Sequence, residues 1–138
     1  MTAPVTVDLD WRGDLRFAGR TGSVEMILDS AGQAGPTPVE ALALSLAGCM
    51  AIDVVHILKK GRLDPRAVHA HLIGERARED PKRLVTVTLH FAVTGDIPAE
   101  KLERALSLSR EKYCSVWHSL RPDLDFKTSF EIVGGTGG

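Results

Sequence analysis

The feature that most constrains the fold is a long apolar stretch at residues 37–61, TPVEALALSLAGCMAIDVVHILKKG. Its start carries helix-capping chemistry, because Thr37 can accept a hydrogen bond from a free amide, Pro38 suits the first helical position, and Glu40 completes a capping box. At its end, two lysines suit the negative pole of the helix dipole, and Gly61 can adopt the left-handed conformation. The stretch therefore predicts one helix of about 22 residues, about 33 Å long.

This helix is apolar nearly all round, a pattern typical of a buried central helix or of a membrane span. Glu40, Asp53 and His56 interrupt it, so no uncharged run of membrane-spanning length remains. Ionisable groups are costly inside a bilayer. The pattern therefore favours a long helix at the centre of the fold, and we expect no membrane partner.

Length and charge narrow the class of protein. The chain has 138 residues, which predicts one domain, residues 1–138, that would gain from a partner subunit. Its net charge of −1 lacks the basic footprint of a protein that binds nucleic acid. The N-terminal residues MTAPVTVDLD show no secretory signal, which predicts a cytoplasmic location. There, two cysteines are either inert buried thiols or a working redox pair.

Alternation and turn residues predict the other elements as an α+β chain in the order βββ-α-ββ-αα-β, without βαβ alternation. The first three strands should form an antiparallel meander, with Gly19–Gly22 as a turn, and the next two should form a hairpin. The glycine-rich end is expected to be flexible. The expected strands are Val5–Asp10, Leu15–Ala18, Val24–Asp29, Ala67–Ala77, Leu84–Thr94 and Leu124–Val133, with a second helix opening at Ile97 and a helical segment at Glu111–His118.

The two cysteines are the main candidates for chemistry. Cys49 and Cys114 are 65 positions apart, so only the fold decides whether they meet. By helical spacing, Ser45, Asp53 and His56 lie on the same side of the long helix as Cys49. The imidazole can favour the thiolate or accept its proton, with Asp53 orienting the ring. The alternative is that Asp53 and His56 satisfy each other at the helix surface.

Three histidines form the only candidate metal site in the pattern. His69 and His71 share one face of a predicted strand, and His90 lies in the strand expected to pair with it. Such a triplet can hold a metal. However, no cysteine or carboxylate stands at ligand spacing, and the chain lacks CxxC, HExxH and glycine-rich phosphate motifs. We therefore expect no metal and no cofactor.

Both cysteine motifs resemble those of one protein family. PVE at residues 38–40, AGCMAIDVV at 47–55 and ILKKGR at 57–62 resemble the first cysteine helix of the OsmC/Ohr proteins, especially the OsmC-like YhfA-type subgroup. EKYCSV at residues 111–116 resembles the second cysteine motif of that family. The predicted element order also agrees with the family over nearly the whole chain.

The resemblance implies an intertwined homodimer, with two long helices at its centre and two active sites at the subunit interface. It also implies the reduction of organic hydroperoxides, and the apolar helix that lines the expected site predicts a preference for them over hydrogen peroxide. Cys49 would be the peroxidatic thiolate that becomes a sulfenic acid, and Cys114 the resolving thiol that condenses with it to a disulfide. An external dithiol would restore both thiols, without a metal or a bound cofactor.

The sequence departs from the family at the groups that activate the cysteine. Ohr-type hydroperoxide reductases carry a glutamate ten residues before the first cysteine and an arginine from an early strand. Here Val39 occupies that position and Glu40 is displaced by one residue, while the arginine is Arg16 or Arg20. In a regular helix, Glu40 also falls on the face opposite Cys49. By resemblance we select Arg20 and Glu40.

The sequence is also compatible with two other functions. One is a noncatalytic protein that binds a small apolar or acyl ligand, and another is a redox sensor whose disulfide changes a partner contact. The activating group for the cysteine also stays open among several residues. These are Arg16, Arg20, Glu40, Asp53 and His56.

Overall fold

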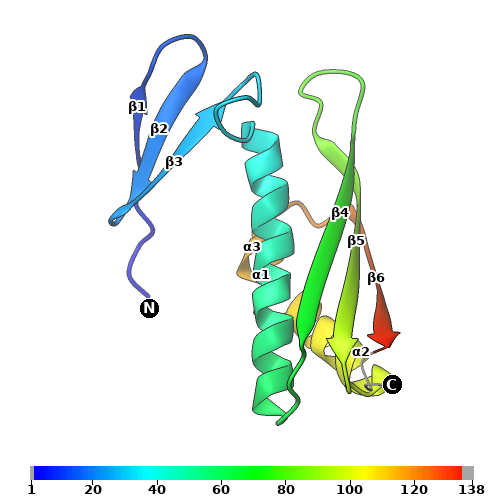
Figure 1. The fold of residues 1–138 in the computed structure, drawn as a ribbon. Coiled ribbons are helices and arrows are strands. Elements are labelled where there is room, and N and C mark those ends of the chain that lie inside the picture. The colour runs from blue at the N-terminus through cyan, green and yellow to red at the C-terminus, as the bar shows by residue number, and fades with distance from the viewer. Residues whose placement is uncertain (1, 135–138) are drawn as a thin grey trace. The chain divides into compact units, whose positions relative to one another are not determined.

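The computed structural model describes residues 2–134, which are drawn as a ribbon in Figure 1. They form two compact units, which divide within the long helix between residues 44 and 45. The N-terminal unit holds an antiparallel sheet in the order β1-β2-β3, so the predicted meander is confirmed. The C-terminal unit holds a second sheet together with most of the long helix. The glycine-rich end at residues 135–138 lies outside the described residues.

The strands of the first sheet are β1 (Asp8–Trp11), β2 (Arg16–Thr21) and β3 (Val24–Asp29). β1 begins later than predicted and includes Trp11. The predicted turn at Gly19–Gly22 is wrong, because β2 continues through Thr21. The actual turn needs only two residues, and Gly22 has a φ of 58°, which suits the first central position of a tight hairpin turn.

The end of β3 is organised around a buried carboxylate. Asp29 is 2% exposed and accepts hydrogen bonds from the backbone N–H groups of Ala31, Gln33 and Ala34, and from Arg16 Nε at 3.0 Å. The backbone hydrogen bonds, then the Arg16 guanidinium, lower the pKa of Asp29 from 3.8 to about 2. Arg16 thus has a structural partner that fixes the chain just before the long helix.

The long helix, α1 (Pro38–Lys60), has 23 residues, so its predicted start and end are confirmed, but the left-handed conformation expected at Gly61 is adopted by Arg62, with a φ of 62°. The capping box is formed in both directions: Thr37 N donates to Glu40 Oε1 at 2.9 Å, and Glu40 N donates to Thr37 Oγ1 at 3.2 Å. By length and composition, α1 is the one helix among residues 2–134 that could cross a membrane. Core helices of soluble proteins meet the same criterion, so this is weak evidence for a span.

The second sheet contains β4 (Ala67–Arg76), β5 (Leu84–Gly95) and β6 (Asp125–Gly134), in that order. β4 and β5 form the predicted antiparallel hairpin. β6, however, pairs with β5 in parallel. Between β5 and β6 the chain passes through α2 (Ala99–Leu108), a π-helical turn η1 (Ser109–Tyr113) and α3 (Ser115–His118). This path makes one βαβ crossover, which the sequence analysis did not anticipate.

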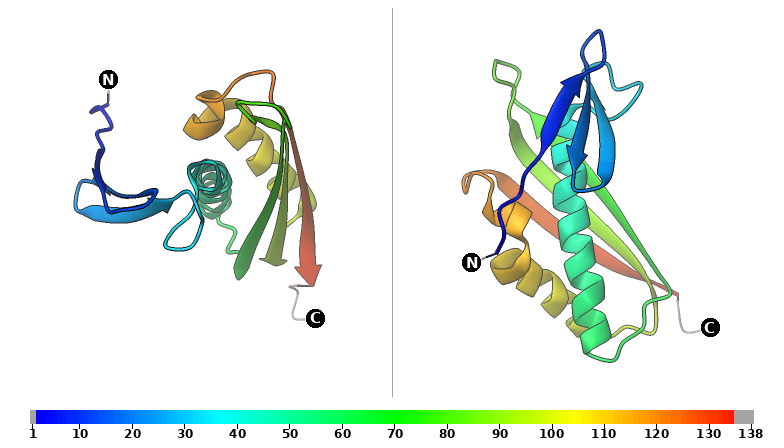
Figure 2. Two further views of the ribbon diagram at one scale, coloured as in Figure 1. Left: turned by 90° about the horizontal axis from the view of Figure 1, so that it is seen from above. Right: turned by 90° about the vertical axis from the view of Figure 1, so that its left-hand side faces the viewer.

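Both α1 and α2 pack on one face of the β4-β5-β6 sheet (Figure 2). α1 contributes a buried row with a spacing of four: Leu46, Met50, Val54 and Leu58. Within one chain the helix buries only this face, and Ile52 on another side is 71% exposed. The core is completed by the inward residues of β5 and α2 and by one cysteine: Val87, Leu89, Phe91, Val93, Leu102, Ala105, Leu106 and Cys114.

The buried carboxylate of the N-terminal unit predicts a pH effect on stability. Because folding lowers the pKa of Asp29 from 3.8 to about 2, its charge stabilises the folded chain above pH 4, and this contribution is lost as the pH falls toward 2. We expect Asp29→Asn to lower the free energy of unfolding at neutral pH and to flatten its decline between pH 4 and pH 2. Urea denaturation over this range measures both effects.

The matched control is Asp10→Asn, which removes the exposed ion pair of Asp10 with Arg20. Exposed ion pairs contribute little to stability. An Asp29→Asn protein with the pH dependence of the unsubstituted chain would contradict the prediction.

Candidate active site

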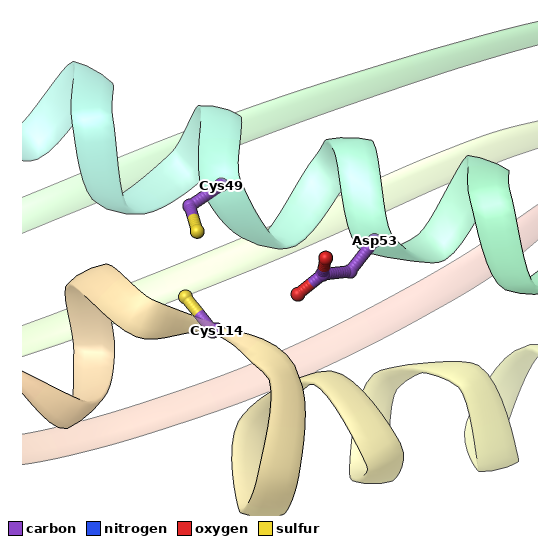
Figure 3. A group of neighbouring side chains, drawn as sticks. All are labelled: Cys49, Asp53 and Cys114. Carbon is purple, nitrogen blue, oxygen red and sulfur yellow. The ribbon is translucent and has the colours of Figure 1, made fainter. Parts of the chain in front are cut away.

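The fold brings the two cysteines together inside the C-terminal unit (Figure 3). Cys49 lies on α1, and Cys114 lies between η1 and α3. Both are free thiols, and their Sγ atoms lie within 4.8 Å of each other. A disulfide requires the sulfurs to approach to about 2 Å. The pair is therefore near enough for a small movement to join them.

The two thiols have different surroundings. Cys49 is half-buried, and its Sγ lies 3.9 Å from Ser115 Oγ. Cys114 is fully buried and caps the start of α3, where its Sγ accepts a hydrogen bond from Trp117 N at 3.4 Å. Trp117 is itself fixed by a ring contact with Phe126 at 4.7 Å between centroids. Cys49 is thus the more accessible thiol, and Cys114 is part of the core.

Burial raises the pKa of Cys114 from 9.0 to about 11. The Trp117 N–H opposes this shift, whereas a hydrogen bond with Cys49 and the negative charges of Cys49 and Asp53 add to it. Removing a proton from Cys114 would place another negative charge beside two groups that can be negative already. Cys114 is therefore a protonated thiol at neutral pH.

The π-helical turn connects Cys114 to the long helix. Ser109, the first residue of η1, is fully buried, and its backbone oxygen accepts a hydrogen bond from Cys114 N at 2.7 Å. Its hydroxyl donates to Asp53 Oδ2 on α1 at 2.8 Å. One residue thus holds both the backbone of a cysteine and the carboxylate beside it. Single π-helical turns are rare in proteins overall, but those that occur are often found at functional sites.

Asp53 is the third member of the cluster. One of its carboxylate oxygens lies within 4.8 Å of both Sγ atoms. Two thiolates and a carboxylate can hold a thiophilic cation such as Zn²⁺, but metal binding requires both cysteines to lose their protons. The high pKa of Cys114 opposes this. The arrangement fits a dithiol redox pair better than a metal centre.

A cavity of about 390 Å³ lies beside Asp53. It also reaches His56, so this imidazole opens onto the same space as the carboxylate. The hydrogen bond of Asp53 goes to Ser109, a partner that the sequence analysis missed because 56 positions separate the two residues. The lining is mostly apolar and consists of Asp53, His56, Ile57, Lys60, Leu108 and Tyr113.

The other predicted site residues have local partners. Arg20 pairs with Asp10 on the neighbouring strand, and Glu40 is held in the capping box, both in the N-terminal unit. His90 uses both ring nitrogens, on Ser129 Oγ at 2.8 Å and on Glu131 Oε1 at 3.0 Å. Across residues 2–134, the cluster that could hold a metal contains the two cysteines and Asp53, not the three histidines.

The unequal burial of the thiols predicts unequal reactivity. At pH 8, only about 0.1% of Cys114 is thiolate if its pKa is about 11. We expect iodoacetamide to label Cys49 in the folded protein at least roughly tenfold faster than Cys114. Peptide mass spectrometry after timed quenching measures both rates, and labelling in urea is the control. Equal labelling of the folded thiols would contradict the assignment.

Comparisons with known proteins agree with the architecture. The family model described as OsmC-like protein matches residues 30–129. The protein YhfA of Escherichia coli (strain K12) is 40% identical over 126 residues, which cover 89% of this chain and 94% of the relative.

Among solved structures, a hypothetical protein from Aquifex aeolicus has a TM-score of 0.88 and 30% identity, over 95% of this chain and 97% of the other. An organic hydroperoxide resistance protein OsmC from Legionella pneumophila has a TM-score of 0.70 and 18% identity, over 95% and 98% of the two chains, so it supports the fold alone. With the cysteine pair in place on this fold, the chain belongs to the OsmC-like family.

Proposed function

We propose that this protein is a thiol-dependent peroxidase that reduces organic hydroperoxides. The observation that carries the proposal is the pairing of a half-exposed thiol, Cys49, with a buried thiol, Cys114, whose Sγ lies within 4.8 Å of it. Two structures with the same fold are named organic hydroperoxide resistance proteins, from Legionella pneumophila and Bacillus subtilis. Their names support the reaction class.

In the first step, the Cys49 thiolate attacks the terminal oxygen of the O–O bond. The S–O bond forms as the O–O bond breaks, the alkoxide leaves and takes up a proton as an alcohol, and Cys49 becomes a sulfenic acid. Cys49 has this role because its half-buried position admits a peroxide, whereas Cys114 is fully buried and its pKa is raised to about 11.

In the second step, Cys114 Sγ displaces the hydroxyl of the sulfenic acid, and a disulfide and water form. An external dithiol then reduces the disulfide. The protein's own residues supply both sulfurs, so the cycle requires no metal or bound cofactor. We place the reaction in the cytoplasm, where reducing systems keep thiols available.

The cavity beside Asp53 supports an organic substrate. Its apolar lining includes Ile57, Leu108 and Tyr113. Burying a hydrocarbon group there gives binding energy that hydrogen peroxide lacks. The proposed preference for organic hydroperoxides therefore rests on an apolar cavity that is lined in part by Asp53, the neighbour of both sulfurs.

We include Arg20 and Glu40 in the proposed catalytic set because of the family resemblance. An arginine guanidinium beside a thiolate favours the charged form, and a glutamate can orient the guanidinium. Arg16 is less suited to this role, because the buried Asp29 already holds it. Arg20 has an exposed partner, Asp10, from which it can separate at little cost.

We further propose that residues 1–138 form a single OsmC-like domain that assembles as an intertwined homodimer. An apolar surface on α1 and β4 is uncovered within one chain and includes Ala51, Ile52, Val55 and Val68. Ile52 is 71% exposed there. A second copy of α1 packed against this surface would remove it from water, which the apolar composition of the helix favours.

The peroxidase proposal is tested by matched serine substitutions and single turnovers with cumene hydroperoxide. We expect Cys49→Ser to reduce peroxide consumption to the background rate. Cys114→Ser should still consume about one equivalent, but it should accumulate a sulfenic acid instead of a disulfide. Peroxide consumption, thiol titration and peptide mass spectrometry measure these outcomes. In the same assay, Arg20→Ala and Glu40→Gln should slow the first step.

Unchanged peroxide consumption in Cys49→Ser would overturn the mechanism. Survival of both thiols after a stoichiometric dose would instead favour a noncatalytic protein that binds a small ligand in the cavity. A disulfide that forms but is regenerated only slowly would favour a redox sensor.

The homodimer is tested by sedimentation equilibrium. We expect twice the mass of the chain at micromolar concentration, and a shift toward the monomer in Ile52→Asp, because a charge would replace a buried contact. The matched control is Ile73→Asp. Ile73 is also exposed, but it alternates with Leu72 and so faces away from the core. A protein that sediments as a monomer at all concentrations would contradict the proposal.

A further inference from the structure

Asp53 occupies a special position relative to the two sulfurs. It follows Cys49 by one helical turn on the same side of α1, and one carboxylate oxygen lies within 4.8 Å of both Sγ atoms. In Figure 3 its carboxylate points toward the two cysteines. Its side chain is the one carboxylate among residues 2–134 that forms a cluster with them.

Ser109 holds this carboxylate in place. Its hydroxyl donates to Asp53 Oδ2 at 2.8 Å, and its backbone oxygen accepts from Cys114 N at 2.7 Å. Because Ser109 is fully buried, water does not compete for these bonds. The π-helical turn thus fixes the carboxylate and the resolving cysteine relative to each other.

The resolving step requires a group that removes a proton. Cys114 is fully buried, and this burial, the largest cause of its raised pKa in the reduced protein, persists after Cys49 is oxidised, so the thiolate stays scarce at neutral pH. A nearby base must take the proton as the sulfur attacks. Asp53 lies beside the thiol and also lines the cavity of about 390 Å³, so a proton that it accepts can pass on to water.

We propose, on the basis of the proposed peroxidase function, that Asp53 is the general base of the resolving step. As Cys114 Sγ attacks Cys49 Sγ, the thiol proton passes to the Asp53 carboxylate. The S–S bond forms, the S–O bond of the sulfenic acid breaks, and the leaving hydroxide takes up a proton as water. The sulfenic sulfur is reduced and the thiol sulfur is oxidised, so the step needs no other electron donor.

A second effect of Asp53 acts in the opposite direction. Its negative charge adds to the high pKa of Cys114, so removing the charge would by itself favour the thiolate and speed the resolving step. This charge effect is the smallest of the contributions to that pKa, of which burial is the largest. General-base catalysis contributes roughly 10²–10⁴-fold to rates. The loss of the base should therefore dominate.

The test is rapid mixing of reduced full-length Asp53→Asn with one equivalent of cumene hydroperoxide. Dimedone trapping and peptide mass spectrometry follow the sulfenic acid of Cys49 and its conversion to the disulfide. We expect the second step to slow by roughly tenfold or more, so that the sulfenic acid accumulates. Asp53→Glu should recover part of the rate, because it restores a carboxylate.

Two further variants separate catalysis from folding. Ser109→Ala keeps the carboxylate but removes its hydrogen bond, and we expect a smaller slowing of the same step. Asp125→Asn, at an exposed position on β6, should leave the second step unchanged. Circular dichroism confirms that each variant is folded.

The outcomes distinguish this inference from the function on which it rests. If the unsubstituted protein forms no sulfenic acid, the proposed peroxidase function fails. If it does, but the second step in folded Asp53→Asn is as fast as in the unsubstituted protein or faster, or folded Asp53→Glu is no faster than Asp53→Asn, the general-base role is overturned. Slowing in Asp53→Asn with partial recovery in Asp53→Glu supports it.

Discussion

The burial of one row of side chains on α1 determines where the reactive groups lie. Leu46, Met50, Val54 and Leu58 pack into the core with a spacing of four. Cys49 and Asp53 each precede a residue of this row, so the packing that fixes the rotation of α1 also fixes their direction. Each buried apolar side chain contributes about 1.5–3 kcal/mol, more than the roughly 0.5–1.5 kcal/mol of a single hydrogen bond. The core therefore positions the helix, and the Ser109 hydrogen bond refines the site.

The unequal chemistry of two identical side chains follows from the elements that carry them. Cys49 lies on the side of a helix, half-buried and near a hydroxyl, whereas Cys114 belongs to the crossover connection between β5 and β6 and is buried in the core. Burial raises the pKa of Cys114, yet the Sγ atoms of the two cysteines stay within 4.8 Å of each other. A peroxidase of the proposed kind needs this combination, because its first thiol must meet the substrate and its second must remain protonated until the sulfenic acid forms.

Local signals in the sequence were enough to predict most elements but not their long-range contacts. The N-terminal cap of α1 was predicted because Thr37 and Glu40 act within one turn of the helix start, whereas the left-handed residue after the helix end is Arg62 and not the expected Gly61. Gly19 was misassigned to a turn, because a glycine within a strand looks like a turn until its neighbours are known. The meeting of Cys49 with Cys114 and the Ser109 to Asp53 hydrogen bond depend on the parallel crossover. No local pattern indicates the π-helical turn that aligns them.

The cap of α3 gives the cysteine chemistry a structural consequence. The sulfur of Cys114 caps this four-residue helix by accepting a hydrogen bond from Trp117 N, and Trp117 also contacts Phe126 and lies near the guanidinium of Arg110. A sulfur that moves to bond another sulfur must loosen or reorient this hydrogen bond. In the proposed cycle, disulfide formation therefore changes the conformation of the short segment that carries Trp117, so the environment of its indole differs between the reduced and the oxidised protein.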